Sequence, residues 1–263
     1  MATTIAVLSQ KGGTGKTTTV RTLSDVLSRI GLDVLAVDLD PQGNLSDYFD
    51  VPSDADPTIA DVLAGRVKAV DAVHGNVIPA NLSLAESELV LGGKMGREMT
   101  LRRALREVKR RRDVIIIDCP PSLGLLTVNA LVAADYALLT TEAQYFSLQG
   151  VEQALELLDA AREDLNPDLQ WLGVVLNIAD LRTVHSREAL AQLKERFEDS
   201  VFDTAIRQSI RYAESAERGI PILDHRPELG ADYLALADEV LDRLGWTEER
   251  ERLATLRAEL VPA

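Results

Sequence analysis

Cysteine is almost absent from this sequence, since Cys119 is the one such residue among 263. A single cysteine excludes an internal disulfide and any metal site built from several cysteines of one chain. Long apolar runs are also missing: none approaches the ~18 residues of a membrane span. The first residues, MATTIAV, enter a strand without a basic leader. We therefore expect a cytoplasmic protein with no membrane partner.

Positive charge is in deficit, with 28 lysines and arginines against 42 acidic residues and a net charge of −14. This balance argues against a chain coated by nucleic acid, because phosphate binding needs a local positive field. The basic residues are unevenly spread, however. Between Lys94 and Arg112, nine basic residues stand against two acidic ones. This run is either an ordinary solvated helix face or a surface for an anionic partner.

Short β-branched or apolar runs alternate with longer segments of helical periodicity, a pattern typical of βαβ units. It predicts a doubly wound, mostly parallel α/β sheet with helices on both faces. We expect one domain over residues 1–263, with a charged, helical tail from about residue 246. The expected strands are Thr4–Ser9, Val34–Asp38, Val114–Asp118, Tyr136–Thr140, Leu172–Asn177, Ile220–Leu223 and a weaker Asn76–Pro79. The expected helices are Thr17–Ile30, Leu101–Arg111, Leu148–Glu163, His185–Glu198 and Leu229–Leu244.

A glycine-rich segment, QKGGTGKTT over residues 10–18, lies between a predicted strand and a predicted helix. In this context glycines let backbone N–H groups curl around phosphate oxygens at a helix N-terminus. Lys16 is placed to reach the β- and γ-phosphates, and the Thr17 hydroxyl to bind Mg²⁺. The strict Walker A pattern fails at Gln10, and a second lysine stands at Lys11. The predicted ATP-binding residues are Lys11, Gly12, Gly13, Thr14, Gly15, Lys16, Thr17 and Thr18.

Carboxylates follow two further strands, at the edge where doubly wound sheets bind ligands. Asp40, in VDLDPQGN, is expected to orient an attacking water or to reach Mg²⁺ through water. The alternative for Asp40 is an Asx-turn that closes the strand. Asp118 ends the apolar run Val114–Ile117 in the Walker B manner and is expected to bind Mg²⁺ through water. Thr17, Asp40 and Asp118 are thus the predicted metal site, and Lys11, Lys16 and Asp40 the predicted catalytic residues.

These motifs together identify a family resemblance. The sequence resembles the ParA branch of the ParA/MinD ATPases, which have a deviant Walker P-loop. The resemblance rests on QKGGTGKTT, VDLDPQGN, DVIIIDCPPSLGLLTVNAL, QYFSLQG, RYAESAERGIPILDH and GADYLALADEVL. It implies an ATP-sandwich homodimer in which Lys11 crosses to the partner's nucleotide, and slow hydrolysis that needs Asp40. It also implies nonspecific DNA binding by the ATP dimer and stimulation of hydrolysis by a ParB-type or other cargo adaptor.

The resemblance places a DNA-contacting arginine at Arg211, with Arg207, Arg218 and Arg182 as neighbours. The chain departs from the family just before it, reading IRQSIR over residues 206–211 where members often read IPRNVR. That departure removes a proline and an asparagine that help to hold adenine. Asn177 resembles an adenine-reading asparagine of related members, or it caps the end of its strand.

Four other functions compete with DNA partition. A MinD-like membrane ATPase needs a basic amphipathic C-terminal helix, whereas the end of this chain is acidic and mixed. A nitrogenase-reductase-type protein needs two cysteines per subunit. A metabolic P-loop enzyme, such as an ATP-dependent ligase, would lack the DPQGN segment. A nucleotide-gated ATPase that positions a protein cargo would use the same ATP chemistry, and the sequence does not separate it from partition.

Overall fold

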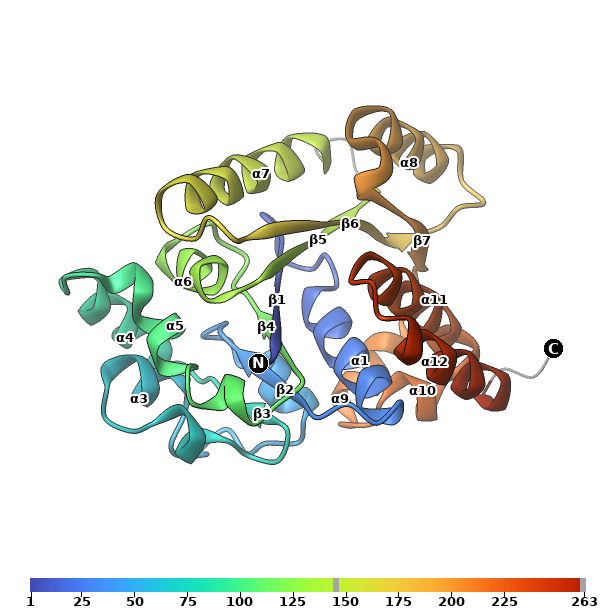
Figure 1. Ribbon diagram of the computed structural model, residues 1–263. Coiled ribbons are helices and arrows are strands. Elements are labelled where there is room, and N and C mark those ends of the chain that lie inside the picture. Colours follow the sequence, from blue (N-terminus) through green and yellow to red (C-terminus); the bar gives the residue numbers. More distant parts are fainter. Residues whose placement is uncertain (144–146, 261–263) are drawn as a thin grey trace.

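A seven-stranded sheet organises the computed structural model, which describes residues 1–143 and 147–260 (Figure 1). The strand order is β3-β2-β4-β1-β5-β6-β7, and every pairing between these neighbours is parallel. The predicted doubly wound α/β fold is therefore confirmed. Residues 144–146 of the QYFSLQG segment lie outside the described residues.

The strands alternate with helices along the chain. The strands are β1 Thr3–Leu8, β2 Val34–Asp38, β3 Val77–Ile78, β4 Val114–Asp118, β5 Tyr136–Glu142, β6 Gln170–Ala179 and β7 Val201–Arg207. The helices are α1 Lys16–Arg29, α2 Asn44–Tyr48, α3 Ile59–Ala64, α4 Ser83–Gly92, α5 Thr100–Ala104, α6 Leu125–Ala133, α7 Ser147–Asp164, α8 Val184–Phe197, α9 Arg211–Glu217, α10 Ile222–His225, α11 Pro227–Arg243 and α12 Thr247–Leu260. Short 3₁₀ turns are η1 Ala69–Ala72, η2 Arg97–Met99, η3 Val108–Arg110 and η4 Glu198–Ser200.

The central strands are buried on both faces because successive side chains of a strand point to opposite sides of the sheet. In β4, Ile115 and Ile117 enter one apolar core, and Val114 and Ile116 enter the other. Helices α6 and α7 cover the first core, and α1, α11 and α12 cover the second (Figure 1). Such two-sided burial explains the nearly continuous apolar composition of β4.

The structure corrects several predicted elements. The expected strand Ile220–Leu223 is wrong: Pro221 precedes the short helix α10, which buries Ile222 and Leu223. The seventh strand is instead β7, which the sequence reasoning missed because Asp203 and Arg207 interrupt its apolar pattern. It tolerates them because it lies at the edge of the sheet.

Two helical predictions are refined. The predicted helix Leu101–Arg111 is divided into α5 and η3, and the predicted charged tail forms α12, which packs on α11 and buries Leu253. None of the described helices combines the length and apolar composition that a membrane crossing requires.

The topology brings the sequence motifs to one edge of the sheet. Strands β2, β4, β1, β5 and β6 are consecutive neighbours and run in the same direction. Their carboxyl ends therefore meet at one edge. The glycine-rich loop leaves β1 there, the DPQGN loop leaves β2, and Asp118 ends β4.

Candidate functional site

The glycine-rich loop between β1 and α1 is held in shape by hydroxyl groups beneath it. The Thr14 side chain is buried and donates to Ser9 Oγ at 2.9 Å, and its Oγ1 lies 3.0 Å from Thr140 Oγ1 on β5. Ser9 Oγ in turn donates to the Lys11 carbonyl at 2.7 Å. The Thr14 hydroxyl thus fixes the loop from inside, and the predicted contact of Thr14 with nucleotide is left to its backbone N–H.

Lys16, the first residue of α1, has its side chain folded under the loop. The residue is only 6% exposed, and its Nζ donates to Ser9 Oγ at 3.2 Å. This buried ammonium group has a neutral oxygen as its hydrogen-bond partner, and a buried charge is stabilised when an opposite charge pairs with it. An anion in the loop would compensate that charge.

Below the start of α1 lie two buried carboxylates. Thr17 Oγ1 donates to Asp118 Oδ2 at 2.7 Å, and Asp38, at the end of β2, faces Asp118 from the neighbouring strand. Asp118 Oδ1 is buried without a hydrogen-bond partner in the described part of the chain. Burial raises the pKa of Asp118, and the charge of Asp38 raises it further. Such a pair favours a nearby cation.

Asp38 also anchors the loop that carries Asp40. Its Oδ2 accepts from the Ser46 backbone N–H at 2.9 Å and from Ser46 Oγ at 2.7 Å, while its Oδ1 accepts from the Asp40 N–H at 3.1 Å. Asp40 Oδ1 accepts from the Gln42 N–H at 3.0 Å, so the Asx-turn considered from the sequence is present. Asp40 also lines the cavity beside the glycine-rich loop. An Asx-turn at Asp40 is therefore compatible with a role of its carboxylate in orienting water or binding Mg²⁺.

A cavity of 600 Å³ opens above these groups. It brings together most of the predicted phosphate and metal residues, and Asp118 lies below it through Thr17. A second cavity, of 360 Å³, shares Gly13, Gly15, Thr18 and Ala216 with the first and extends it toward β6 and α9. The first cavity is lined by Gly12, Gly13, Gly15, Lys16, Thr17, Thr18, Asp40, Gln42, Asn44, Asp47, Tyr48, Pro121, Ala216 and Glu217.

Asn177, near the end of β6, lies in the wall of the second cavity and is 1% exposed. Its Nδ2 donates to the Thr14 carbonyl at 2.9 Å and to Thr19 Oγ1 at 3.2 Å, so it ties β6 to the glycine-rich loop. Its Oδ1 has no hydrogen-bond partner among the described residues. The side chain thus has an unsatisfied acceptor in addition to its structural bonds. The next residue, Ile178, has a φ of 54°, a strained value for a β-branched residue.

Lys11 lies at the surface of the loop, with 62% of its side chain exposed. Its Nζ is 3.7 Å from Glu142 Oε2, at the end of β5. Lys11 does not line the cavity that holds Lys16. The two lysines of the loop therefore occupy different environments, one buried beneath the loop and one exposed above it.

The predicted DNA-contacting arginines lie outside the two cavities, except that Arg207 borders the second. Three of them are neutralised within the chain. Arg182 pairs with Asp180 at 2.8 Å, Arg207 with Asp232 at 2.8 Å and Arg211 with Glu214 at 2.7 Å. The side chain of Arg218 has no ion pair within the described ranges.

A nucleoside triphosphate with Mg²⁺ fits this arrangement. The backbone N–H groups of the glycine-rich loop and the Lys16 ammonium group are suited to bind phosphates. Asp118 Oδ1, which has no hydrogen-bond partner among the described residues, is suited to bind a cation or the water bound to it. The orphaned Asn177 Oδ1, in the adjoining cavity, suits an amino group such as that of adenine. No group of three or more carboxylate, histidine or cysteine side chains in the described ranges forms a metal site alone.

Comparisons with known proteins show the family of the chain. A family described as an AAA domain matches residues 2–171. Over 249 residues the chain is 40% identical to the sporulation initiation inhibitor protein Soj of Bacillus subtilis, covering 91% of this chain and 98% of that protein. It is 37% identical over 261 residues to the chromosome partitioning protein ParA of Caulobacter vibrioides, covering 95% and 96%. The chain belongs to the ParA/MinD family of P-loop ATPases.

Solved structures of family members agree with the fold. Cobyrinic acid a,c-diamide synthase from Mycobacterium smegmatis, with bound ADP and magnesium, is 38% identical with a TM-score of 0.76, covering 83% of this chain and 91% of that one. The septum site-determining protein MinD of Pyrococcus horikoshii, complexed with Mg-ADP, is 29% identical with a TM-score of 0.76, covering 95% and 99%. The family thus includes members of different function.

Several residues of the site escaped the sequence reasoning. Asp38 was predicted only as the end of a strand, although its carboxylate anchors the DPQGN loop. Tyr48 and the two tyrosines of the second cavity, Tyr212 and Tyr233, were missed as well. The RYAESAERG motif contains Tyr212 and was the available signal, but only the folded chain brings α9 and α11 against the loop.

Proposed function

We propose that this protein is a ParA-type ATPase in which ATP and Mg²⁺ drive formation of a homodimer. The whole chain acts as one ATPase domain. The dimer binds DNA without sequence preference, and slow hydrolysis returns it to monomers. The observation that carries the proposal is the pair of lysines in one loop. Lys16 is buried beneath the loop, while Lys11 is exposed and does not line the cavity that Lys16 lines.

The residues of the site then have distinct roles. Backbone N–H groups from Gly12 to Thr17 cradle the phosphates, and Lys16 supplies the compensating charge. Thr17 and Asp118 would hold Mg²⁺, directly and through water, and the ion would neutralise charge on the phosphate oxygens. Asp40, on the rim of the same cavity, orients the attacking water. Lys11 contacts the nucleotide of the second subunit.

The cargo is proposed from the relatives. Soj and ParA are named for sporulation and chromosome partitioning, which supports partition of a chromosome or plasmid. A ParB-type or other cargo adaptor would stimulate hydrolysis and release the dimer from DNA. The protein would then be cytoplasmic and associated with the nucleoid. A protein cargo moved over the nucleoid would use the same cycle.

Dimerisation tests the role of Lys11. With ATP and Mg²⁺, light scattering should show the wild type shifting from monomer to dimer, and Lys11→Ala should stay monomeric while still binding ATP. Lys194→Ala removes an exposed lysine of α8 that pairs with Asp203, and as a matched control it should dimerise normally. Normal dimerisation of Lys11→Ala would overturn the two-subunit site.

Asp40→Ala tests the hydrolytic step separately. The substitution leaves the loop and Lys16 in place, so the variant should bind ATP, form the dimer and accumulate in it. Its hydrolysis should fall close to background, and each tenfold loss corresponds to about 1.4 kcal/mol of barrier. Full turnover in this variant would move the catalytic role to another residue.

A biosynthetic ligase is a second candidate, because the synthase described above is 38% identical to this chain. A ligase consumes ATP only when a carboxylic acid substrate is present to be activated. ATP hydrolysis by the protein with water alone, accelerated by DNA or by an adaptor protein, would favour the partition ATPase. Strict dependence on a small carboxylic acid would favour the ligase.

A further inference from the structure

The exposed lysine of the glycine-rich loop faces a cavity other than the phosphate cavity. This cavity has a volume of 240 Å³ and is lined by the loop, by the end of β5 and by the first half of α7. Lys11 and Glu142 both line it, and neither residue lines the cavity that Lys16 lines. The Lys11 side chain is therefore turned toward α7 and away from the phosphate cavity of its own subunit.

A carboxylate meets Lys11 on that side of the loop. Glu142 ends β5, and its Oε2 lies 3.7 Å from Lys11 Nζ. Its Oε1 faces the same loop at Gly13, where an added Cβ would lie 3.8 Å from it. Only 15% of the Glu142 side chain is exposed, against 62% of the Lys11 side chain. The glutamate is thus held at the end of the strand, while the lysine can rotate into solvent.

The backbone at Lys11 does not take part in this contact. The Lys11 carbonyl accepts from Ser9 Oγ at 2.7 Å, which fixes the main chain of the loop from beneath. The ammonium group lies at the end of a flexible four-carbon stem that stands outside this hydrogen bond. Nζ can therefore move from one anion to another without a change in the loop that binds phosphate.

We propose that Glu142 is a positioning residue, which holds Lys11 in the nucleotide-free subunit and gives it up to the nucleotide of the second subunit. This inference rests on the proposed function, in which Lys11 contacts that nucleotide. The two anions compete for one ammonium group. A triphosphate carries more negative charge than a single carboxylate and accepts more hydrogen bonds, so Lys11 leaves Glu142 only when ATP is present across the interface.

The competition makes dimer formation depend more steeply on ATP. Without a triphosphate, Lys11 already has an anionic partner inside its own subunit, and a second subunit offers it nothing better. With ATP, each dimer breaks two ion pairs between Lys11 and Glu142, one in each subunit. Glu142 therefore opposes dimerisation, although it does not line the phosphate cavity of its own subunit.

The expected size of the effect follows from the exposure of the pair. Removal of one partly exposed ion pair changes an equilibrium constant by roughly two- to threefold, because solvent screens the attraction. Two pairs are broken per dimer, so Glu142→Gln should tighten the dimer by about fivefold. Nucleotide binding to a single subunit should stay unchanged, because Glu142 lies outside the phosphate cavity.

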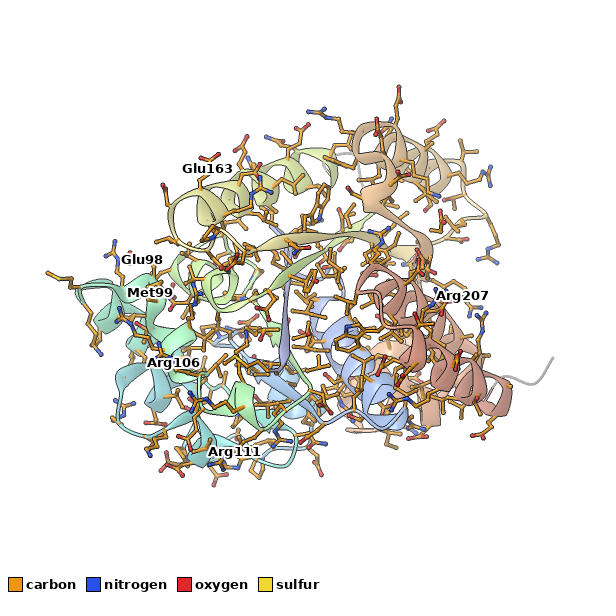
Figure 2. All side chains as sticks on the ribbon, in the orientation of Figure 1. Glu98, Met99, Arg106, Arg111, Glu163 and Arg207 are labelled. Carbon is orange, nitrogen blue, oxygen red and sulfur yellow. The ribbon has the colours of Figure 1, made fainter. Side chains whose placement is uncertain are left out.

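The test measures dimer dissociation constants by analytical ultracentrifugation, with a non-hydrolysable ATP analogue and Mg²⁺. Glu142→Gln keeps the size of the side chain and removes its charge. The matched control, Glu107→Gln, makes the same change at a glutamate that pairs with Arg111 at 2.9 Å beside η3. Figure 2 shows Arg111 on the side of the molecule opposite α7, so this ion pair is remote from the cavity beside α7.

A second measurement reports the contact itself. In nucleotide-free protein, the ¹⁵N resonance of the Lys11 ammonium group should shift in Glu142→Gln and stay in place in Glu107→Gln, because only the first substitution removes a charge beside Lys11. If Glu142→Gln tightens the dimer without moving this resonance, Glu142 acts as a general negative charge at the interface and the positioning proposal is overturned. An unchanged or weaker dimer in Glu142→Gln overturns it as well.

Lys11→Ala separates this proposal from the proposed function. If Lys11→Ala dimerises like the wild type, the two-subunit site fails, and this proposal fails with it. If Lys11→Ala stays monomeric and the dimer constant of Glu142→Gln equals that of the wild type, this proposal fails alone and the proposed function stands. Support for both requires a monomeric Lys11→Ala, a tighter dimer in Glu142→Gln and an unchanged dimer in Glu107→Gln.

Discussion

Gly15→Ala probes how the glycine-rich loop is held. Gly15 has a φ of +80°, in the left-handed region, and a Cβ added there would lie 2.7 Å from Asn177 Nδ2. Asn177 cannot yield easily, because it is buried and its Nδ2 donates to the Thr14 carbonyl and to Thr19 Oγ1. The substitution therefore combines backbone strain with displacement of a side chain that bridges β6 to the loop.

The magnitude follows from these two parts. An L-residue in the left-handed region costs about 1–2 kcal/mol. Loss of the two hydrogen bonds of Asn177 costs about 1 kcal/mol each. Gly15→Ala should therefore lower the free energy of unfolding by about 3–4 kcal/mol in total. Gly245 provides a matched control, since its φ is +72° and a Cβ there would have no neighbour within 4 Å. Gly245→Ala should show the strain alone.

Urea denaturation of the nucleotide-free protein measures these differences. Asn177→Ala removes both the hydrogen bonds and the obstructing group, so the double variant Gly15→Ala/Asn177→Ala should be about as stable as Gly15→Ala alone. The coupling energy is then about 2 kcal/mol. If Gly15→Ala costs no more than Gly245→Ala, or if the two substitutions are additive, the clash with Asn177 does not control the loop.

Three further substitutions test other contacts. Lys16→Ala should abolish ATP binding in isothermal titration, because water does not replace the buried ammonium beneath the loop, and unchanged affinity would refute the phosphate site. Tyr48→Phe removes the hydrogen bond between α2 and Ser215 of α9 and should lower the unfolding free energy by about 1 kcal/mol in urea; no loss would mean that this bond does not join the two helices. Glu214→Gln releases Arg211 from its ion pair and should strengthen ATP-dependent DNA binding in anisotropy, whereas weaker binding would contradict a phosphate-contacting Arg211.

Much of the fold and of the phosphate site was predictable because the determining patterns are local. The β-branched run Val114–Ile117 specifies a buried strand by composition alone, and the glycines at 12, 13 and 15 specify a loop between a strand and a helix. Once the strands are parallel, their carboxyl ends share an edge, and this places Asp40 and Asp118 near Lys16. The positions of functional side chains at the carboxyl ends of strands can therefore be predicted from the sequence pattern and the parallel topology together.

The structure of edge strands and of surface segments depends on residues distant in the chain. For these segments the predictions from sequence were wrong or missing. The strand β7 is stable with Asp203 and Arg207 because it lies at the edge of the sheet, and the segment at Pro221 became a helix.

The P-loop, its two lysines and the family can be read from the amino-acid sequence. Which cations have a carboxylate partner depends on how the helices and strands pack. Arg207 meets Asp232, 25 residues away, through the packing of α11 on β7, while Arg106 and Arg110 remain without an ion pair in the described part of the chain. A charge pattern in a sequence does not record such pairing, because the distance between two side chains is set by the packing of whole helices and strands.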